Sequence, residues 1–411
     1  TTQETQFIAR TLAEAGVDSI EISGGVIPTV FHGVVPPQGT ELALNAPYAK
    51  LIKEVVDIPI MCVGRINTPR LAEFVIATGE ADMVSMGRAL NADPEMPNKA
   101  EKGLLDEITP CVGCNEGCIA SVMQGIPARC IVNTQAGRET EDFTTPAEQP
   151  KRIFVAGGGP AGLEAARLAA VRGHEVTLFE SRDKLGGQVN LASVAPYKQE
   201  TSQVIRYLAR AVEKAGVSVE LGKKLTPELV EELKPDTVIV ATGARPIKPT
   251  SIPGIDGENV VSSWEVLGGT SKAALSGNIV IIGGGLVGCE VADFLADTED
   301  NTGAVPTKVT MLEMQPRMAI EGIDEVRHLL MQRLHEKGVE MINNATVKEI
   351  LADGVVYTTP EGGEQRVQGA EFVILALGSQ SVDELSEEIK SIVQEVHVTG
   401  DAKQVARILE A

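Results

Sequence analysis

Apolar residues along the chain alternate between short continuous runs and stretches with a period of three to four residues. This pattern predicts alternating strands and helices. In residues 1–105 the predicted helices are Thr5–Ala15, Pro47–Val56, Pro69–Thr78 and a last one that ends near Lys102, and the predicted strands are Val17–Ile22, Ile58–Val63 and Met83–Met86. Their order is that of three βα units of a β/α barrel, in which active sites lie at the carboxyl ends of the strands.

Three such units are too few for a closed barrel, which takes roughly 200 residues or more. We therefore interpret the chain as a fragment that begins within a barrel. The alternative is that another polypeptide supplies the remaining strands. A helical pattern that stops abruptly at Val405–Ala411 favours the fragment.

From Lys151 onward the pattern predicts a second architecture, in which one strand–turn–helix–strand motif occurs twice. The first copy has a strand at Arg152–Ala156, glycines at Gly157, Gly159 and Gly162, and Glu180 at the end of the next strand. The second copy has a strand at Asn278–Ile282, glycines at Gly283, Gly285 and Gly288, and Glu313 at the end of the next strand. Glycine turns that lead into a helix, followed by an acidic residue, are typical of dinucleotide binding, with the pyrophosphate at the helix N-terminus.

The second acidic residue also predicts which nicotinamide cofactor is preferred. A carboxylate at Glu313 accepts a hydrogen bond from the ribose 2′-hydroxyl of NADH and repels the 2′-phosphate of NADPH, so we expect NADH to be the cofactor. Arg317, four residues further on, could reach a phosphate, but we interpret it as a surface residue.

Four cysteines lie between the two architectures, within twenty residues: Cys111, Cys114, Cys118 and Cys130. Four thiolates suit a [4Fe–4S] cluster or a zinc ion. The run contains one C-x2-C pair and no nearby histidine, which favours iron and sulfur, while zinc, a disulfide or free thiols remain alternatives. Gly113 and Gly117 allow the loop to wrap closely around a bulky group.

The carboxyl ends of the predicted barrel strands supply further candidates. Gly64-Arg65 and Gly87-Arg88 place backbone amides and guanidinium groups where a phosphate is expected, and the alternative is that the arginines merely cap the barrel rim. The five histidines lack metal-ligand spacing, and His32, in the loop after the first strand, is a candidate acid or substrate ligand.

Composition narrows the class of protein. The net charge of −21 argues against nucleic acid or an anionic membrane surface as a partner. No apolar run reaches the length of a membrane span, and no signal-peptide pattern is present. Six cysteines, four of them clustered, fit a reducing compartment, so a cytoplasmic location is expected. The oligomeric state is left open, and a homo-oligomer is compatible with the sequence.

In this order, the motifs resemble the iron–sulfur flavoenzymes of the 2,4-dienoyl-CoA reductase, enoate reductase and trimethylamine dehydrogenase family, which carry an Old Yellow Enzyme-like barrel. The resemblance extends over nearly the whole chain and rests on IPIMCVGRINTP, ADMVSMGRALNADPE, CVGCNEGCIASVMQGIPARCIVN, VAGGGPAGLEAARLAAVRGHEVTLFE, KLGGQVN and VTGDA. It implies an α/β fold with the C-terminal part of a TIM (β/α)8 barrel, a cysteine segment, and two interlocked Rossmann-like domains.

The resemblance also implies the cofactors and their sites. FMN is expected at Arg65, Gly87 and Arg88, a [4Fe–4S] cluster on the four cysteines, FAD in the first dinucleotide unit, and NADH in the second. The FAD contacts implied are Gly157, Gly159, Ala161, Gly162, Glu180, Gln188 and Asp401. The corresponding segments are 1–105 for the partial barrel, 106–150 for the cysteines and linker, 151–250 and 376–411 for the FAD domain, and 251–375 for the NAD(P) domain.

The function expected from this layout is NADH-dependent reduction of an activated carbon–carbon double bond, in an enoyl-CoA, dienoyl-CoA or enoate. Electrons would flow from NADH to FAD, through the cluster to FMN, and then to the small-molecule substrate. Two alternatives remain. One is an amine dehydrogenase or demethylase with the opposite flow, and the other is an electron-transfer subunit like the small subunit of glutamate synthase.

Overall fold

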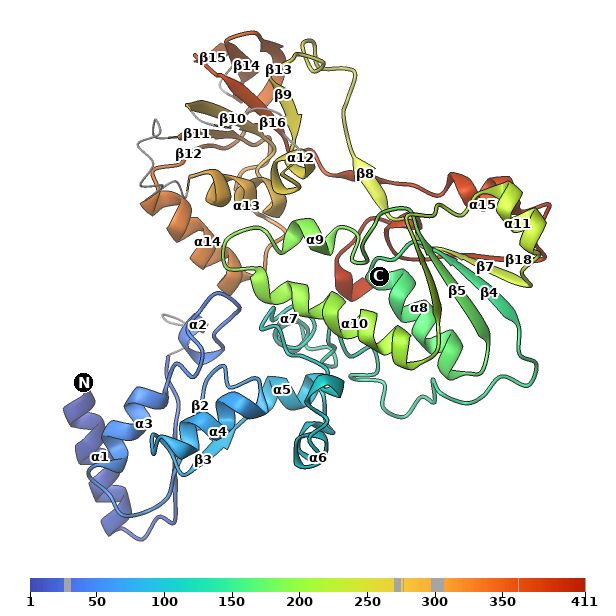
Figure 1. Cartoon of the computed structure of the whole chain (residues 1–411). Helices are drawn as coiled ribbons and strands as arrows, with labels where there is room; N and C mark the ends of the chain where they lie inside the picture. Colours follow the sequence, from blue (N-terminus) through green and yellow to red (C-terminus); the bar gives the residue numbers. More distant parts are fainter. Residues whose placement is uncertain (26–30, 270–274, 276, 297–306, 361, 411) are drawn as a thin grey trace. The chain divides into compact units, whose positions relative to one another are not determined.

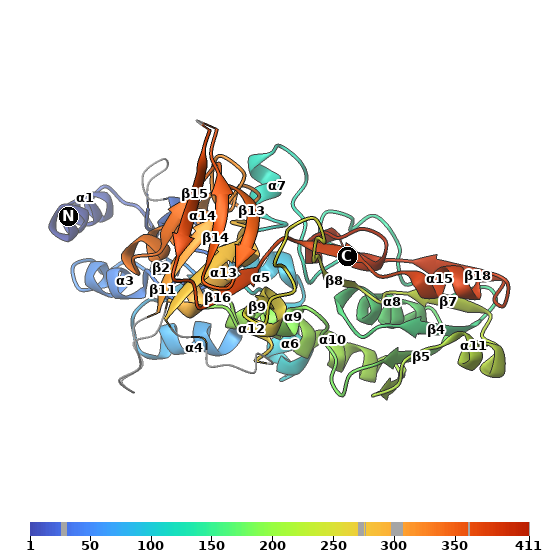
Figure 2. The ribbon, with the colours of Figure 1, turned by 90° about the horizontal axis from the view of Figure 1, so that it is seen from above.

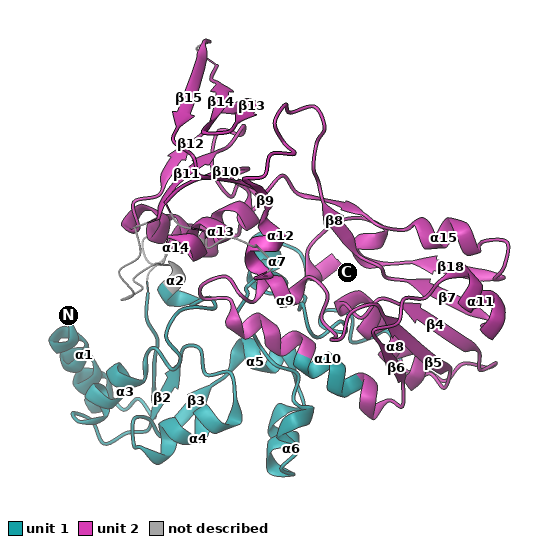
Figure 3. Cartoon of the chain, turned by 45° about the horizontal axis from the view of Figure 1, so that its top comes forward, with its two compact units in different colours: residues 1–143, 206–211 teal, residues 144–205, 212–411 magenta. Residues whose placement is uncertain are grey.

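The computed structural model describes residues 1–25, 31–269, 275, 277–296, 307–360 and 362–410 (Figure 1). The chain divides into two compact units. Unit 1 consists of residues 1–143 and 206–211, and unit 2 of residues 144–205 and 212–411 (Figure 3). The cysteine segment belongs to unit 1, and both glycine turns belong to unit 2.

Unit 1 is built on a parallel sheet in the order β1-β2-β3, with β1 at Ile20–Ile22, β2 at Ile60–Val63 and β3 at Met83–Ser85. Helices α1 (Thr2–Glu14), α3 (Ala46–Lys53) and α4 (Pro69–Ala77) accompany these strands. Thr68 caps α4 by accepting a hydrogen bond from the Leu71 amide, and Pro69 fits the first helical turn because it has no N–H to satisfy. The core of the sheet is fully buried at Ile60 and Cys62.

The long helix predicted after β3 is divided. Helix α5 covers Gly87–Ala92 and α6 covers Met96–Glu101, with the extended residue Asp93 between them. Asp93 precedes Pro94, and the proline ring disfavours a helical conformation of the residue before it. The short elements η1 (Leu105–Glu107) and α7 (Ile119–Met123) follow.

Unit 2 begins with a parallel sheet in the order β18-β7-β4-β5-β6. Its strands are β4 (Arg152–Ala156), β5 (Glu175–Glu180), β6 (Ser218–Leu221), β7 (Thr237–Val240) and β18 (Glu395–Val398). Helix α8 (Pro160–Val171) connects β4 to β5 and lies along the sheet in Figure 1. Because β18 pairs with β7, the end of the chain returns to the sheet of the first glycine turn.

The second sheet of unit 2 has the order β12-β11-β10-β16-β9 and is also parallel. Its strands are β9 (Val260–Ser262), β10 (Asn278–Ile282), β11 (Lys308–Leu312), β12 (Glu340–Ile342) and β16 (Phe372–Leu375). Helices α12 (Ser263–Leu267), α13 (Leu286–Leu295) and α14 (Asp324–Glu336) belong to it.

Two smaller sheets and the remaining helices complete unit 2. An antiparallel sheet that the sequence pattern did not predict contains β13 (Thr346–Leu351), β14 (Gly354–Thr358) and β15 (Glu364–Gln368) (Figure 2). Strands β8 (Ala244–Pro246) and β17 (Ser379–Ser381) form an antiparallel pair. The remaining elements of unit 2 are α9 (Val189–Ala192), η2 (Gln199–Thr201), α11 (Pro227–Leu233), α15 (Glu384–Ile389), η3 (Gly400–Ala402) and η4 (Ile408–Glu410). Helix α2 (Phe31–Val34) belongs to unit 1, and α10 (Ser202–Lys214) is divided between the units, with residues 206–211 in unit 1.

The predicted α/β class, with barrel-type βα units before two Rossmann-like sheets, is confirmed. The finer limits of the five predicted segments stay predictions. Within the described residues, no helix combines the length and the apolar character that crossing a membrane requires. The cytoplasmic location also stays a prediction.

Candidate functional site

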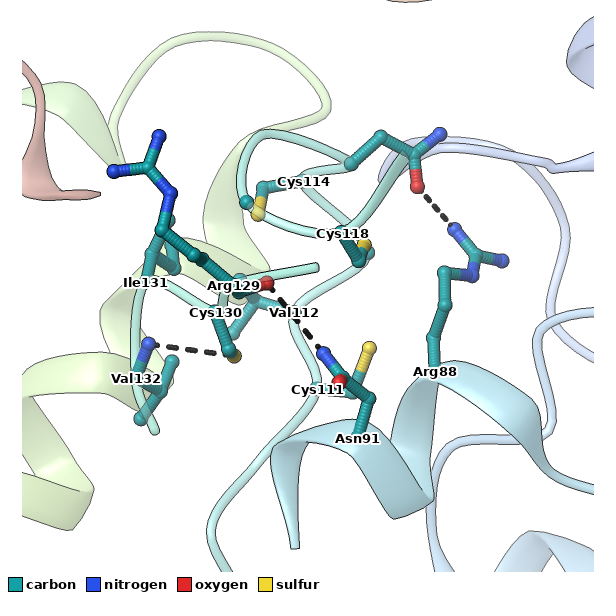
Figure 4. Close-up of a pocket in the computed structure, with 13 residues that line it drawn as sticks. Arg88, Asn91, Cys111, Val112, Cys114, Cys118, Arg129, Cys130, Ile131 and Val132 are labelled. Atoms are coloured by element: carbon teal, nitrogen blue, oxygen red, sulfur yellow. Dashed lines mark hydrogen bonds between the residues drawn. The ribbon is translucent and has the colours of Figure 1, made fainter. Parts of the chain in front are cut away.

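The four clustered cysteines line one pocket of unit 1 (Figure 4). Cys111 and Cys114 lie in the loop after η1, Cys118 immediately precedes α7, and Cys130 follows α7 after a second loop. Cys111 and Cys130 lie 19 positions apart in the sequence, so the fold must bring their two loops together. Gly117 permits this contact.

The close approach at Gly117 leaves no space for a side chain. The Arg129 amide donates a hydrogen bond to the Gly117 carbonyl at 2.6 Å. A Cβ atom at position 117 would meet the Arg129 carbonyl oxygen at 2.6 Å, closer than atoms pack. Glycine at this position therefore joins the loop of Cys114 and Cys118 to the loop of Cys130.

Burial and charge act in opposite directions on these thiols. Burial raises the pKa of Cys111, Cys114 and Cys118, because the thiolate is the form that loses solvation. The positive charge of Arg88 partly offsets this by lowering the pKa of Cys111 and Cys118. The Val132 amide donates to the Cys130 sulfur at 3.5 Å. Backbone N–H contacts of this kind orient sulfur ligands.

The arrangement of the donors tests which group they fit. In the part of the chain that the structure describes, no three histidine, cysteine, aspartate or glutamate side chains are grouped tightly enough to hold one metal ion. A zinc ion needs sulfurs about 2.3 Å from a common point. The cysteines instead surround a shared pocket (Figure 4). Four cysteines around one pocket are a donor set that suits a [4Fe–4S] cluster or a zinc ion, and the cluster stays a prediction.

Arg88 connects the barrel-type part of unit 1 to this pocket. It lies in the first turn of α5 and its Nη1 atom donates to the Asn115 side-chain oxygen at 2.5 Å. Asn115 lies between Cys114 and Cys118, is 1% exposed and donates to the Val35 carbonyl at 3.0 Å. Arg88 was a candidate from the sequence, but Asn115 was not, because no feature of the sequence pattern indicates a hydrogen bond between the two.

The other candidates at the strand ends have different surroundings. Arg65 is buried, has a φ of 51° and donates to the Thr40 carbonyl. Gly87 begins α5 and has open space where a Cβ would lie. The assignment of Arg65, Gly87 and Arg88 to FMN stays a prediction. The backbone of His32 lies in α2, whereas its side chain is outside the described part, so its role also stays a prediction.

The first glycine turn of unit 2 is closed by contacts that demand glycine. A Cβ at Gly162 would meet the Gly157 carbonyl oxygen at 1.9 Å, and Gly157 has a φ of 114°. By contrast, a Cβ at Gly159 would meet no atom within 4 Å. Gly162 therefore serves helix–strand packing, while Gly159 leaves open space at the start of α8, where a phosphate group is accommodated in such turns.

Glu180 is fixed at the end of β5. It is 6% exposed, and its Oε2 atom accepts a hydrogen bond from the Gly158 amide at 2.8 Å. Its Oε1 atom accepts from the Arg182 amide at 2.8 Å. These bonds orient the carboxylate beside the turn, the position from which it would bind a ribose hydroxyl.

The end of the chain returns to the first turn. The Gln188 side-chain amide donates to Asp401 at 2.7 Å, across 213 positions of sequence. A Cβ at Gly400, which has a φ of 59°, would meet the Ala161 Cβ at 2.6 Å. The structure thus brings Ala161, Gln188 and Asp401 to the same turn, and these residues would hold part of FAD.

The second glycine turn repeats the first. A Cβ at Gly288 would meet the Gly283 carbonyl oxygen at 2.0 Å. Glu313, 8% exposed, accepts from the Gly284 amide at 2.5 Å and from the Gln315 amide at 2.7 Å. Gly285 lies at the start of α13, where a dinucleotide pyrophosphate would bind. The polar segment Asp297–Thr307, to which the sequence pattern assigns the longer gap between Gly288 and Glu313, lies outside the described residues except at its final position.

Comparison with known proteins identifies both parts. Residues 151–398 match the family model for pyridine nucleotide-disulphide oxidoreductases. Residues 4–107 match the model for the NADH:flavin oxidoreductase / NADH oxidase family.

Similar curated proteins include a metal reductase from Desulforamulus reducens and an NADH oxidase from Thermoanaerobacter brockii. The metal reductase is 38% identical, over all of this chain and 64% of the relative. The NADH oxidase is 40% identical, over all of this chain and 62% of the relative. A cinnamate reductase from Clostridium sporogenes is 32% identical, and the match covers 98% of this chain and 59% of the length of the relative. The chain thus spans about three fifths of the length of these relatives.

The structure also resembles that of 2-naphthoyl-CoA reductase in complex with 2-naphthoyl-CoA. The TM-score is 0.91 at 30% sequence identity, over all of this chain and 61% of the other. The chain therefore belongs to the pyridine nucleotide-disulphide oxidoreductase family, and its residues 4–107 match the NADH:flavin oxidoreductase / NADH oxidase family.

Proposed function

We propose that the protein uses NADH to reduce an activated carbon–carbon double bond in an α,β-unsaturated acid or acyl-CoA. The observation that carries this proposal is the order of the parts: barrel-type βα units, a pocket of four cysteines, and two dinucleotide turns. The names of two similar proteins, a cinnamate reductase and a 2-naphthoyl-CoA reductase, support the substrate class.

The cofactors and the residues that would hold them are part of this proposal. Gly159, Glu180 and Gln188 would hold FAD, and Gly285 and Glu313 would hold NADH. The four cysteines would ligate a [4Fe–4S] cluster, and Arg65, Gly87 and Arg88 would contact FMN. When bound, flavins supply hydride and electron transfer and an iron–sulfur cluster supplies one-electron transfer.

The balance of the proposed reaction is simple. One NADH is oxidised for each double bond reduced, with a hydride equivalent reaching the β-carbon and a proton reaching the α-carbon. His32 remains the candidate proton donor from the sequence. Glu313 favours NADH over NADPH, because its fixed carboxylate repels a 2′-phosphate.

The test is an anaerobic assay of the full-length protein with NADH and either cinnamate or a 2-enoyl-CoA thioester. We expect NADH oxidation that depends on the acceptor, with one saturated product formed per NADH. NADH oxidation that forms no saturated product from either acceptor would overturn the substrate class. A ferric chelate as acceptor provides a comparison, because another relative is named a metal reductase.

A further inference from the structure

The internal repeat of unit 2 extends beyond the glycine turns into the loops that follow β5 and β11. Leu185 lies five residues after Glu180, and Met318 lies five residues after Glu313. A Cβ at Gly158 would meet the Leu185 side chain at 2.6 Å, and one at Gly284 would meet the Met318 sulfur at 2.1 Å. Each loop therefore packs on the middle glycine of its own turn.

The backbones of the two loops repeat the same contact. The Gly186 amide donates to the Gly158 carbonyl at 2.8 Å, and the Ala319 amide donates to the Gly284 carbonyl at 2.6 Å. Both positions have a positive φ, 48° at Ala319 and 122° at Gly186. Glycine adopts a positive φ readily, whereas alanine rarely does. The two loops can thus be aligned residue by residue.

The alignment pairs Gln188 with Glu321, each eight residues after the acidic residue of its unit. Gln188 is directed to Asp401. Glu321 instead lies on the start of α13, where its Oε1 atom accepts a hydrogen bond from the Leu286 amide at 2.5 Å. The difference is visible at the glycines: a Cβ at Gly159 meets nothing within 4 Å, whereas one at Gly285 would meet Glu321 Oε1 at 2.9 Å.

A dinucleotide pyrophosphate needs this same position, because the N-terminus of the helix offers amide donors and a favourable dipole to an anion. A carboxylate has the same sign of charge as the phosphate and accepts from the same donors. The two groups exclude each other there.

We propose that Glu321 occupies the pyrophosphate position of the second dinucleotide unit and lowers its affinity for NADH until the carboxylate withdraws. The proposal rests on the proposed function, in which this unit binds NADH. Glu321 is exposed, so its side chain has access to solvent. Its backbone carbonyl accepts a hydrogen bond from the Arg407 side chain, and this bond does not involve the Glu321 carboxylate.

The test is direct NADH binding to the full-length protein by isothermal titration calorimetry, for wild type, Glu321→Gln and Glu321→Ala. If the carboxylate competes, Glu321→Ala should bind NADH roughly tenfold more tightly, a change equivalent to about 1.4 kcal/mol. Glu321→Gln should show a smaller gain in the same direction, because an amide oxygen is a weaker competitor. The thermal unfolding midpoint reports whether each variant is folded.

Glu336→Gln is the matched control, because it removes one exposed negative charge from α14 of the same unit. Its NADH affinity should stay close to that of wild type. Unchanged or weaker NADH binding by both Glu321 variants, while wild type binds, would overturn this inference alone. Failure of wild type and both variants to bind NADH would overturn the nucleotide role of the unit as well.

Discussion

Arg88 and Asn115 are joined by a 2.5 Å hydrogen bond between the Arg88 guanidinium and the Asn115 side-chain oxygen. The bond ties α5, at the carboxyl end of β3, to the loop that carries Cys111, Cys114 and Cys118. The same guanidinium lines the cysteine pocket (Figure 4). One residue thus has both a structural and an electrostatic role at the candidate cluster site.

Replacing Arg88 by glutamine should weaken both roles. Asn115 is 1% exposed, so losing a charged partner should cost about 1.5–3 kcal/mol in the free energy of unfolding of this part. The reduction potential of the bound cluster should become more negative, because a nearby positive charge stabilises the reduced form. Urea unfolding and an EPR-monitored redox titration measure the two effects.

Arg138→Gln is the control for that experiment. Arg138 pairs with Glu141 at the surface, where the side chains are 50% and 51% exposed, and such pairs contribute under about 1 kcal/mol. Equal behaviour of the two variants in both measurements would contradict the role assigned to Arg88.

Gly159→Ala and Gly162→Ala separate cofactor binding from folding. A methyl group at position 159 meets open space, so the fold should persist while FAD content falls. At position 162 the methyl group meets the Gly157 carbonyl at 1.9 Å, so the unit should lose about 1–3 kcal/mol of stability. Flavin absorbance and the unfolding midpoint distinguish the two. Full FAD content in folded Gly159→Ala would argue that the space at Gly159 is not used by the cofactor.

Asp293 is a buried charge on α13 whose loss should be severe. It is 1% exposed and pairs with Arg333 at 2.8 Å and with Lys337 at 2.7 Å. Asp293→Asn leaves two cations without their carboxylate and should destabilise unit 2 by about 3–5 kcal/mol. Asp353→Asn, at a surface pair with Arg366, should cost under about 1 kcal/mol. Similar denaturation midpoints for the two variants would show that burial does not govern this site.

The ion pair of Glu395 should make the free energy of unfolding depend on pH. Its hydrogen bonds, first from Lys151 and then from His397, lower its pKa to about 2. A depressed folded-state pKa gives stability that is present above the ordinary value of 4.5 and is lost as the pH falls through about 2. Because the side chain is 39% exposed, the contribution should be under about 1 kcal/mol. Glu395→Gln should be less stable than wild type at pH 7, and the difference should shrink as the pH falls from 4.5 through about 2. A difference that stays constant over this range would contradict the assignment.

Features that depend on nearby residues could be predicted from the sequence. The strands Arg152–Ala156 and Asn278–Ile282 have the predicted limits, because apolar runs ending in glycine turns specify them locally. The break at Asp93 was missed although Pro94 signals it. The strand Thr346–Leu351 was also missed, because only one of its residues is buried and its apolar pattern is weak.

Contacts between distant residues could not be predicted in this way. The partner of Arg88 lies 27 positions away, and the partner of Gln188 lies 213 positions away. Glu321 is an intermediate case. Its distance of eight residues from Glu313 matches that of Gln188 from Glu180, but only the structure shows that its carboxylate lies on α13.

We propose that the cysteine pocket holds an iron–sulfur cluster within a flavin-dependent electron-transfer enzyme. Metal and acid-labile sulfide analysis of the anaerobically purified full-length protein tests it most directly, with Cys62→Ala as a control because Cys62 lies in the core of the β1-β2-β3 sheet. We expect about four irons and four sulfides per chain, the content of a [4Fe–4S] cluster, retained in Cys62→Ala and lost in Cys114→Ser. One zinc per chain without sulfide would contradict it.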